Sequence, residues 1–213
     1  MSRQIFQPRF WILVLIVLAA ATIRILNGAA IMPWANFPII GAIAVFTGSY
    51  FKRWTAVLIS LFTLLISDIA INAGIYSGKF GVMHGGWWWI YSIFFLIVIV
   101  DSLIMRKVTV QRFVIASVVS SLMHWLLSDF MLWINGSTDL RTLKPLSRDI
   151  DGLVQCYIQG IPFLRNYLVG TLVYGAIMFG IFEWIKRRTP ALSAGTAVAE
   201  HAGRIGNTTA TRS

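Results

Sequence analysis

Long apolar stretches follow one another along most of this 213-residue chain, separated by short segments that carry most of its charges. A helix needs about 20 mostly apolar residues to cross a bilayer, because the hydrocarbon core is about 30 Å thick. Stretches that approach this length predict helices over residues 10–26, 37–51, 54–72, 87–105, 113–134 and 160–185. The pattern predicts an all-α fold, a polytopic membrane bundle of six transmembrane helices.

The second predicted helix is the shortest of the six. Pro33 and Pro38 lie at its entrance, and only Lys52 and Arg53 separate it from the third helix. Proline removes a backbone donor and restricts the residue before it, so a helix seldom continues through such a segment. We therefore expect a tight hairpin between the second and third helices, with the second tilted or partly re-entrant.

Composition excludes several classes of protein. Hydrophobic residues make up 57% of the chain and charged residues only 12%, which is unlike an ordinary soluble domain. A single cysteine, Cys156, excludes an intramolecular disulfide and a multi-cysteine metal site. The net charge of +10 comes from Lys and Arg that flank the predicted helices, which is their usual topogenic placement. We expect the lipid bilayer as a partner, no nucleic acid, and no metal or other cofactor.

The distribution of Lys and Arg predicts an orientation. These residues concentrate before the first helix, between the second and third, between the fourth and fifth, and after the sixth. The positive-inside rule then places both termini in the cytoplasm. We predict a transmembrane domain over residues 1–188 and, over residues 189–213, a cytoplasmic tail that is too poor in large apolar residues to fold.

Polar residues inside the predicted helices are the candidates for function, because a charge at the bilayer centre costs roughly 2.5–3.5 kcal/mol on insertion scales. Asp101 and Glu183 lie near the predicted inner ends, and we interpret each as half of an interfacial ion pair with a neighbouring Lys or Arg. The others lie in the predicted outer layer or, for His124, near mid-bilayer: Arg24, Asn36, Asp68, His124, Asp129 and Asn166.

These six residues permit two interpretations. In the first they line a polar pocket that binds a ligand and opens away from the cytoplasm. In the second, Arg24 pairs with Asp68 or Asp129 only to hold helices together. One arginine between two carboxylates leaves one acid in need of a ligand, an ion or Arg165. His124 either binds substrate or relays a proton, or it donates to a backbone carbonyl.

Small residues predict helix contacts, and the motifs bear on whether the protein is an enzyme. Glycines at several helical positions predict close helix contacts, either within the bundle or with a partner subunit: Gly41, Gly48, Gly170, Gly175 and Gly180. The chain has no Gly-x-Ser-x-Gly, no His-Glu-x-x-His and no phosphate-binding glycine loop. We therefore expect a protein that is not an enzyme.

One stretch, NFPIIGAIAVFTGSYF over residues 36–51, resembles the signature of an uncharacterised family of bacterial six-span membrane proteins. Ser67-Asp68, Cys156-Tyr157 and residues 161–166 share the resemblance. That family is similar in size and span count to the S components of energy-coupling-factor (ECF) vitamin transporters. The resemblance implies a pocket open to the outside and energising membrane subunits as partners.

We therefore expect an S-component-like subunit of the bacterial cytoplasmic membrane that captures a small molecule for uptake. The alternative is a structural or scaffolding membrane protein of the cell envelope that binds no ligand.

Overall fold

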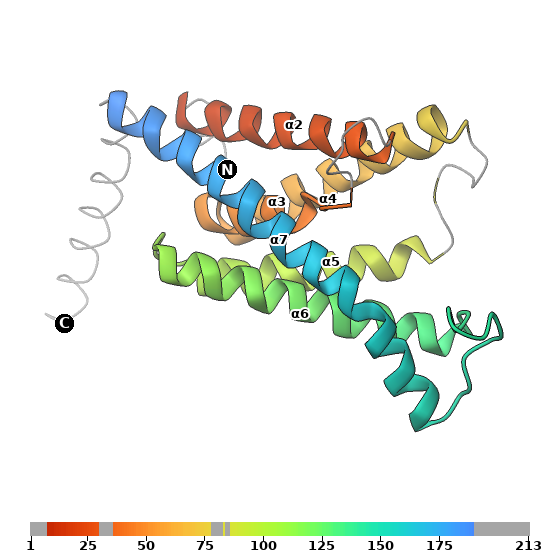
Figure 1. Cartoon of the computed structure of the whole chain (residues 1–213). Coiled ribbons are helices and arrows are strands. Elements are labelled where there is room, and N and C mark those ends of the chain that lie inside the picture. Colours follow the sequence, from red (N-terminus) through yellow and green to blue (C-terminus); the bar gives the residue numbers. More distant parts are fainter. Residues whose placement is uncertain (1–7, 30–35, 78–82, 84–85, 190–213) are drawn as a thin grey trace, which may run out of the picture.

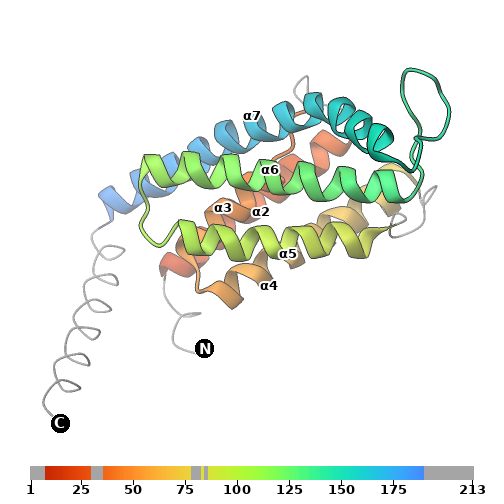
Figure 2. The same cartoon turned by 90° about the horizontal axis from the view of Figure 1, so that it is seen from below.

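The computed structural model describes residues 8–29, 36–77, 83 and 86–189, and helices dominate this part of the chain (Figure 1). The predicted tail lies outside it except for Thr189. The helices are α2 (Pro8–Gly28), α3 (Ile40–Tyr50), α4 (Arg53–Ile69), which continues into the π-helical η1 (Ala70–Ile75), α5 (Trp87–Ile104), α6 (Val110–Ile134) and α7 (Ile150–Arg188). They run alongside one another in one elongated bundle (Figure 2).

Five helical segments of the described chain are long and apolar enough to cross a membrane, namely α2, α4 with η1, α5, α6 and α7. This result fits an integral membrane protein with an all-α fold. The start of α2 and the end of α7 lie at one end of the bundle, and the loop between α6 and α7 lies at the other (Figure 1).

The second predicted helix is shorter than expected. α3 has 11 residues, and at about 1.5 Å per residue it is about 17 Å long. A hydrocarbon core of about 30 Å is thicker than that, so α3 alone does not satisfy the prediction of a full span over residues 37–51. The helix begins only at Ile40, because Pro38 disfavours helical geometry at Phe37 and cannot donate a helical hydrogen bond.

α3 nevertheless forms the centre of the bundle. Eight of its 11 residues are buried, and it contacts α4, α5, α6 and α7 as well as α2. Phe46 is fully buried, and its ring packs edge-on against Phe182 of α7 at a centroid distance of 6.2 Å. A helix surrounded by other helices does not meet lipid along its length, so its hydrophobicity reflects a protein core.

The helix that contains the last predicted span begins ten residues before it. α7 begins at Ile150, where Asp149 caps it by accepting a hydrogen bond from the Gly152 amide at 2.8 Å. An acceptor side chain at this position satisfies one of the first amides of the helix. α7 also passes through Pro162 without ending and bends in its N-terminal third (Figure 1), as expected where proline removes one helical hydrogen bond.

Glycines bring α3 and α7 into close contact. A Cβ atom on Gly41 would overlap Thr171 Oγ1 and lie 2.7 Å from Tyr167 Cε1, and one on Gly170 would lie 2.5 Å from the Pro38 carbonyl oxygen. The predicted close contacts are therefore present at these two positions. Gly180 makes no close contact within the bundle, because a Cβ atom there would have nothing within 4 Å among the described atoms.

This difference predicts opposite effects for one chemical change. Gly41→Ala should destabilise the bundle by about 1–3 kcal/mol, the usual cost of overpacking. Gly180→Ala should be neutral or stabilising, because alanine favours a helix over glycine by up to about 1 kcal/mol. Melting temperatures of the two variants in one detergent test the prediction, and equal values would contradict the close packing of α3 on α7.

Candidate functional site

Arg24 of α2 forms an ion pair with Asp68 of α4. Its Nη2 lies 2.5 Å from Asp68 Oδ1, and its Nη1 donates to Ser67 Oγ at 2.5 Å. Tyr91 of α5 donates its hydroxyl to Asp68 Oδ2 at 3.0 Å. Both carboxylate oxygens of Asp68 therefore have donors from the protein itself, and the network joins three helices.

Asp129 of α6 has no such cation. Its side chain is buried, and Oδ2 has no hydrogen-bond partner among the described residues. Arg165, the other cation considered from the sequence, is exposed and takes part in none of the ion pairs of the described chain. The two aspartates of the predicted layer thus have different surroundings: Asp68 is paired with a cation, while Asp129 lies beside the neutral donors Ser128 and Trp125.

Asp129 lines a cavity of about 440 Å³ between α6, α7 and the segment before α3. Asn36, His124, Asp129 and Asn166 all line it. We call this cavity the Asp129 pocket. The structure brings together four of the six residues singled out from the sequence, while Arg24 and Asp68 form their separate network.

Aromatic rings form much of the remaining wall. Trp125, Phe163 and Tyr167 line the Asp129 pocket, and the His124 ring stacks on Tyr167 with centroids 4.4 Å apart and planes 21° from parallel. The Tyr167 hydroxyl is buried without a partner in the part of the chain that the structure describes. Such a pocket offers flat apolar surfaces beside a few polar groups, which is typical of small-molecule sites.

Gly160 of α7 leaves the space that the Asp129 carboxylate occupies. A Cβ atom there would overlap Asp129 Oδ2 and lie 2.6 Å from Trp125 Nε1. Sequence analysis missed Gly160, Trp125 and Tyr167 as parts of the site. The available signal was that Gly160, Phe163 and Tyr167 are spaced by three and four residues, which places them on one face of a helix.

The interpretation of Asp101 as half of an interfacial ion pair was wrong. Its side chain is fully buried, Oδ1 accepts a hydrogen bond from Ser120 Oγ at 2.6 Å, and Oδ2 has no partner among the described residues. Arg106 and Lys107 lie beyond the end of α5, and both are exposed. Asp101 instead faces α6 in the interior of the bundle.

Glu183 does form the kind of pair expected. Its carboxylate lies 3.2 Å from Lys186 Nζ and accepts a hydrogen bond from the Tyr50 hydroxyl at 2.9 Å. The hydrogen bond from Tyr50 joins the end of α3 to α7 at the opposite end of the bundle from the Asp129 pocket.

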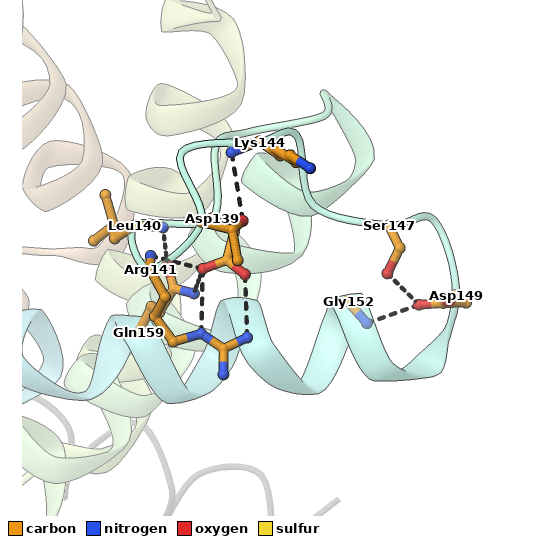
Figure 3. Close-up of polar contacts among 9 residues, drawn as sticks. Asp139, Leu140, Arg141, Lys144, Ser147, Asp149, Gly152 and Gln159 are labelled. Carbon is orange, nitrogen blue, oxygen red and sulfur yellow. Dashed lines mark hydrogen bonds and ion pairs between the residues drawn. The ribbon is translucent and has the colours of Figure 1, made fainter.

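The loop between α6 and α7 is fastened to α7 through Asp139 (Figure 3). Asp139 Oδ1 accepts hydrogen bonds from the Arg141 amide and from Gln159 Nε2, each at 2.8 Å, while Gln159 Oε1 accepts from the Leu140 amide at 2.9 Å. Hydrogen bonds from the Arg141 side chain, and then from its amide, lower the pKa of Asp139 to about 2. The loop is therefore held by a carboxylate that needs its charge.

The shifted pKa predicts how this loop responds to acid. An unfolded aspartate has a pKa of about 3.9, so the stabilising contribution of Asp139 is present above pH 4 and is lost as pH falls through 2. Protection of the Leu140 and Arg141 amides against hydrogen exchange should fall over this range in the native protein. This acid-dependent loss of amide protection should be absent from Asp139→Asn and present in Asp151→Asn. A loss that persists in Asp139→Asn would refute the assignment.

Comparison with known proteins gives one result. No curated protein and no solved structure matches the chain. A family model matches residues 4–192, which include every described helix and all residues of the Asp129 pocket. The chain therefore belongs to DUF6580, a family of unknown function.

Proposed function

We propose that the chain captures a small molecule in the Asp129 pocket and serves as an S-component-like transporter subunit of a bacterial cytoplasmic membrane, without catalysing a reaction. One observation carries the proposal: Asp129, whose buried Oδ2 has no hydrogen-bond partner in the described chain, lines a cavity together with two amides and an imidazole. Buried polar groups almost always have partners, and leaving one unpaired costs about 1–3 kcal/mol or more.

The pocket favours a particular class of ligand. The Asp129 carboxylate accepts hydrogen bonds, so the ligand should present an N–H, an O–H or a cationic group to it. Asn36 and Asn166 carry side-chain amides that can both donate and accept, and aromatic rings form the walls. A volume of about 440 Å³ falls in the range of roughly 300–1,000 Å³ that is usual for small-molecule sites. We infer a polar ligand with a flat apolar portion.

Charge distribution supports an outward-facing pocket. The Asp129 pocket lies toward the end of the bundle with the α6–α7 loop, while the basic segments 52–53, 106–107 and 186–188 lie at the other end. In the proposed orientation the basic end faces the cytoplasm, as do both termini. α3 with its flanking residues then makes the sixth crossing inside the protein, and energising membrane subunits would supply the driving force.

The alternative function is that of a structural membrane protein without a ligand. It is favoured by the network of Arg24 and Asp68. Arg24 and Asp68 satisfy one another and need nothing from outside. This network supports a role for those two residues in holding helices together. It does not account for Asp129.

Thermal stabilisation by ligand tests the proposed function. A low-molecular-mass extract of the source cells should raise the melting temperature of the purified protein, since a ligand at 100 times its Kd contributes about 2.7 kcal/mol. For a chain of this size that is roughly 5–10 °C. Asp129→Asn should lose the shift, and Asp151→Asn, at an exposed acid on α7, should keep it. An equal shift in Asp129→Asn would refute the proposal.

A further inference from the structure

A second polar cavity lies at the opposite end of the bundle from the Asp129 pocket. Its volume is about 850 Å³, and it lies among α2, α7, the end of α3 and the α5–α6 turn. Four cationic side chains from three separate parts of the chain line it: Arg9, Arg106, Lys186 and Arg187. We call this cavity the basic pocket.

The cations of the basic pocket are only partly balanced. Glu183 is the one acid among the described residues that line it, and that carboxylate already pairs with Lys186 and accepts from the Tyr50 hydroxyl. Among the described residues, neither Arg106 nor Arg187 forms an ion pair. The described residues that line the pocket therefore carry an excess of three positive charges at the boundary of the apolar bundle, which favours an anion.

The same cavity also has an apolar wall. Val110 and Phe113 of α6 and Ala176 and Phe179 of α7 form this wall, and the Phe113 and Phe179 rings are in contact at a centroid distance of 5.2 Å. Gly180 lies beside them, and a Cβ atom at that position would meet nothing within 4 Å in the described chain. Residues 176, 179, 180, 183, 186 and 187 follow one another at helical spacing, so a single face of α7 passes from apolar to basic. A ligand that fits both parts has an anionic head and a long apolar portion.

We propose that the basic pocket binds an anionic phospholipid, with its phosphate between Arg106 and Arg187 and an acyl chain along Phe113 and Phe179. Guanidinium groups present paired N–H donors that match phosphate oxygens. Basic pockets between transmembrane helices commonly bind such headgroups. The apolar wall is the reason to prefer a lipid over free phosphate. This inference is independent of the Asp129 pocket and of the proposed function.

Native mass spectrometry of the full chain, delipidated in detergent, tests the proposal. The protein is titrated with dioleoyl phosphatidylglycerol and, separately, with dioleoyl phosphatidylcholine. The wild type should bind the anionic lipid at least about 10-fold more tightly, and Arg106→Gln/Arg187→Gln should weaken that binding by about 30-fold, as expected for two basic contacts. Arg106→Lys/Arg187→Lys should keep most of the preference, because it keeps the charge.

The matched control removes the same charge from the same end of the bundle. Lys52 caps the start of α4 and Arg53 is its first residue; both are exposed, and neither lines the basic pocket. Lys52→Gln/Arg53→Gln should therefore bind phosphatidylglycerol as the wild type does. If Lys52→Gln/Arg53→Gln lost as much affinity for phosphatidylglycerol as Arg106→Gln/Arg187→Gln, the proposal would be overturned in favour of diffuse surface charge.

Two further outcomes would also overturn it. Equal affinity of the wild type for the two lipids would remove the role of the anionic headgroup. Displacement of phosphatidylglycerol by 10 mM inorganic phosphate would assign the site to free phosphate, because it would require a Kd for phosphate of roughly 1 mM. If Arg106→Gln/Arg187→Gln does not fold, the single variant Arg106→Gln is titrated in its place. Arg106 is suited to this because it is exposed and follows the end of α5.

Discussion

Arg24→Gln is expected to lower the free energy of unfolding by about 3–5 kcal/mol, the usual cost of removing one partner from a buried ion pair. The substitution leaves the Asp68 carboxylate, which is only 6% exposed, without its cation. Tyr91 still donates one hydrogen bond to that carboxylate, but a neutral donor does not balance a buried charge. Equilibrium unfolding in detergent, or the melting temperature, measures the loss.

The double variant Arg24→Gln/Asp68→Asn separates a structural pair from a ligand site. If the pair serves only the fold, neutralising both members should cost less than neutralising Arg24 alone, because no unpaired charge remains. Ligand-induced stabilisation should persist in the double variant, since neither residue lines the Asp129 pocket. A double variant that is less stable than the single variant would contradict the structural role of the pair.

Gly160→Ala should reduce ligand affinity by about 10- to 100-fold, the range expected when a charged hydrogen bond worth about 1.5–3 kcal/mol is lost. The added methyl group would occupy the space of Asp129 Oδ2, so the carboxylate must turn away or α7 must move. Gly180→Ala makes the same chemical change on the same helix, in open space, and should leave affinity unchanged. Unaltered affinity in a folded Gly160→Ala protein would contradict the position assigned to Asp129.

Hydrophobic length predicted most of the helices, because a segment that crosses a bilayer has to satisfy its backbone internally and remain apolar over about 20 residues. The same argument failed for α3. Its apolar residues face other helices, and Pro38 delays its start to Ile40. The early start of α7 was missed because residues 150–159 are not uniformly apolar, although the Asp149 cap is a signal that sequence carries.

Depth along each helix could be read from the sequence, but the direction in which each side chain points could not. Asp68 and Asp129 are predicted to share a layer, yet the rotation and packing of their helices place one beside Arg24 and the other beside Gly160. Asp101 shows the same limit. It lies near Arg106 along the chain but points toward Ser120, because a helical residue contacts whatever its own face meets. Sequence therefore found the polar groups, and packing decided their partners.

Native mass spectrometry of the protein purified gently from its own membranes tests the central claim most directly. The account predicts a bound small molecule, identifiable by its mass, that is absent from Asp129→Asn and retained by Arg24→Gln/Asp68→Asn. A wild-type protein that carries no small molecule but holds larger subunits in fixed stoichiometry would contradict the account and favour a structural role in an assembly.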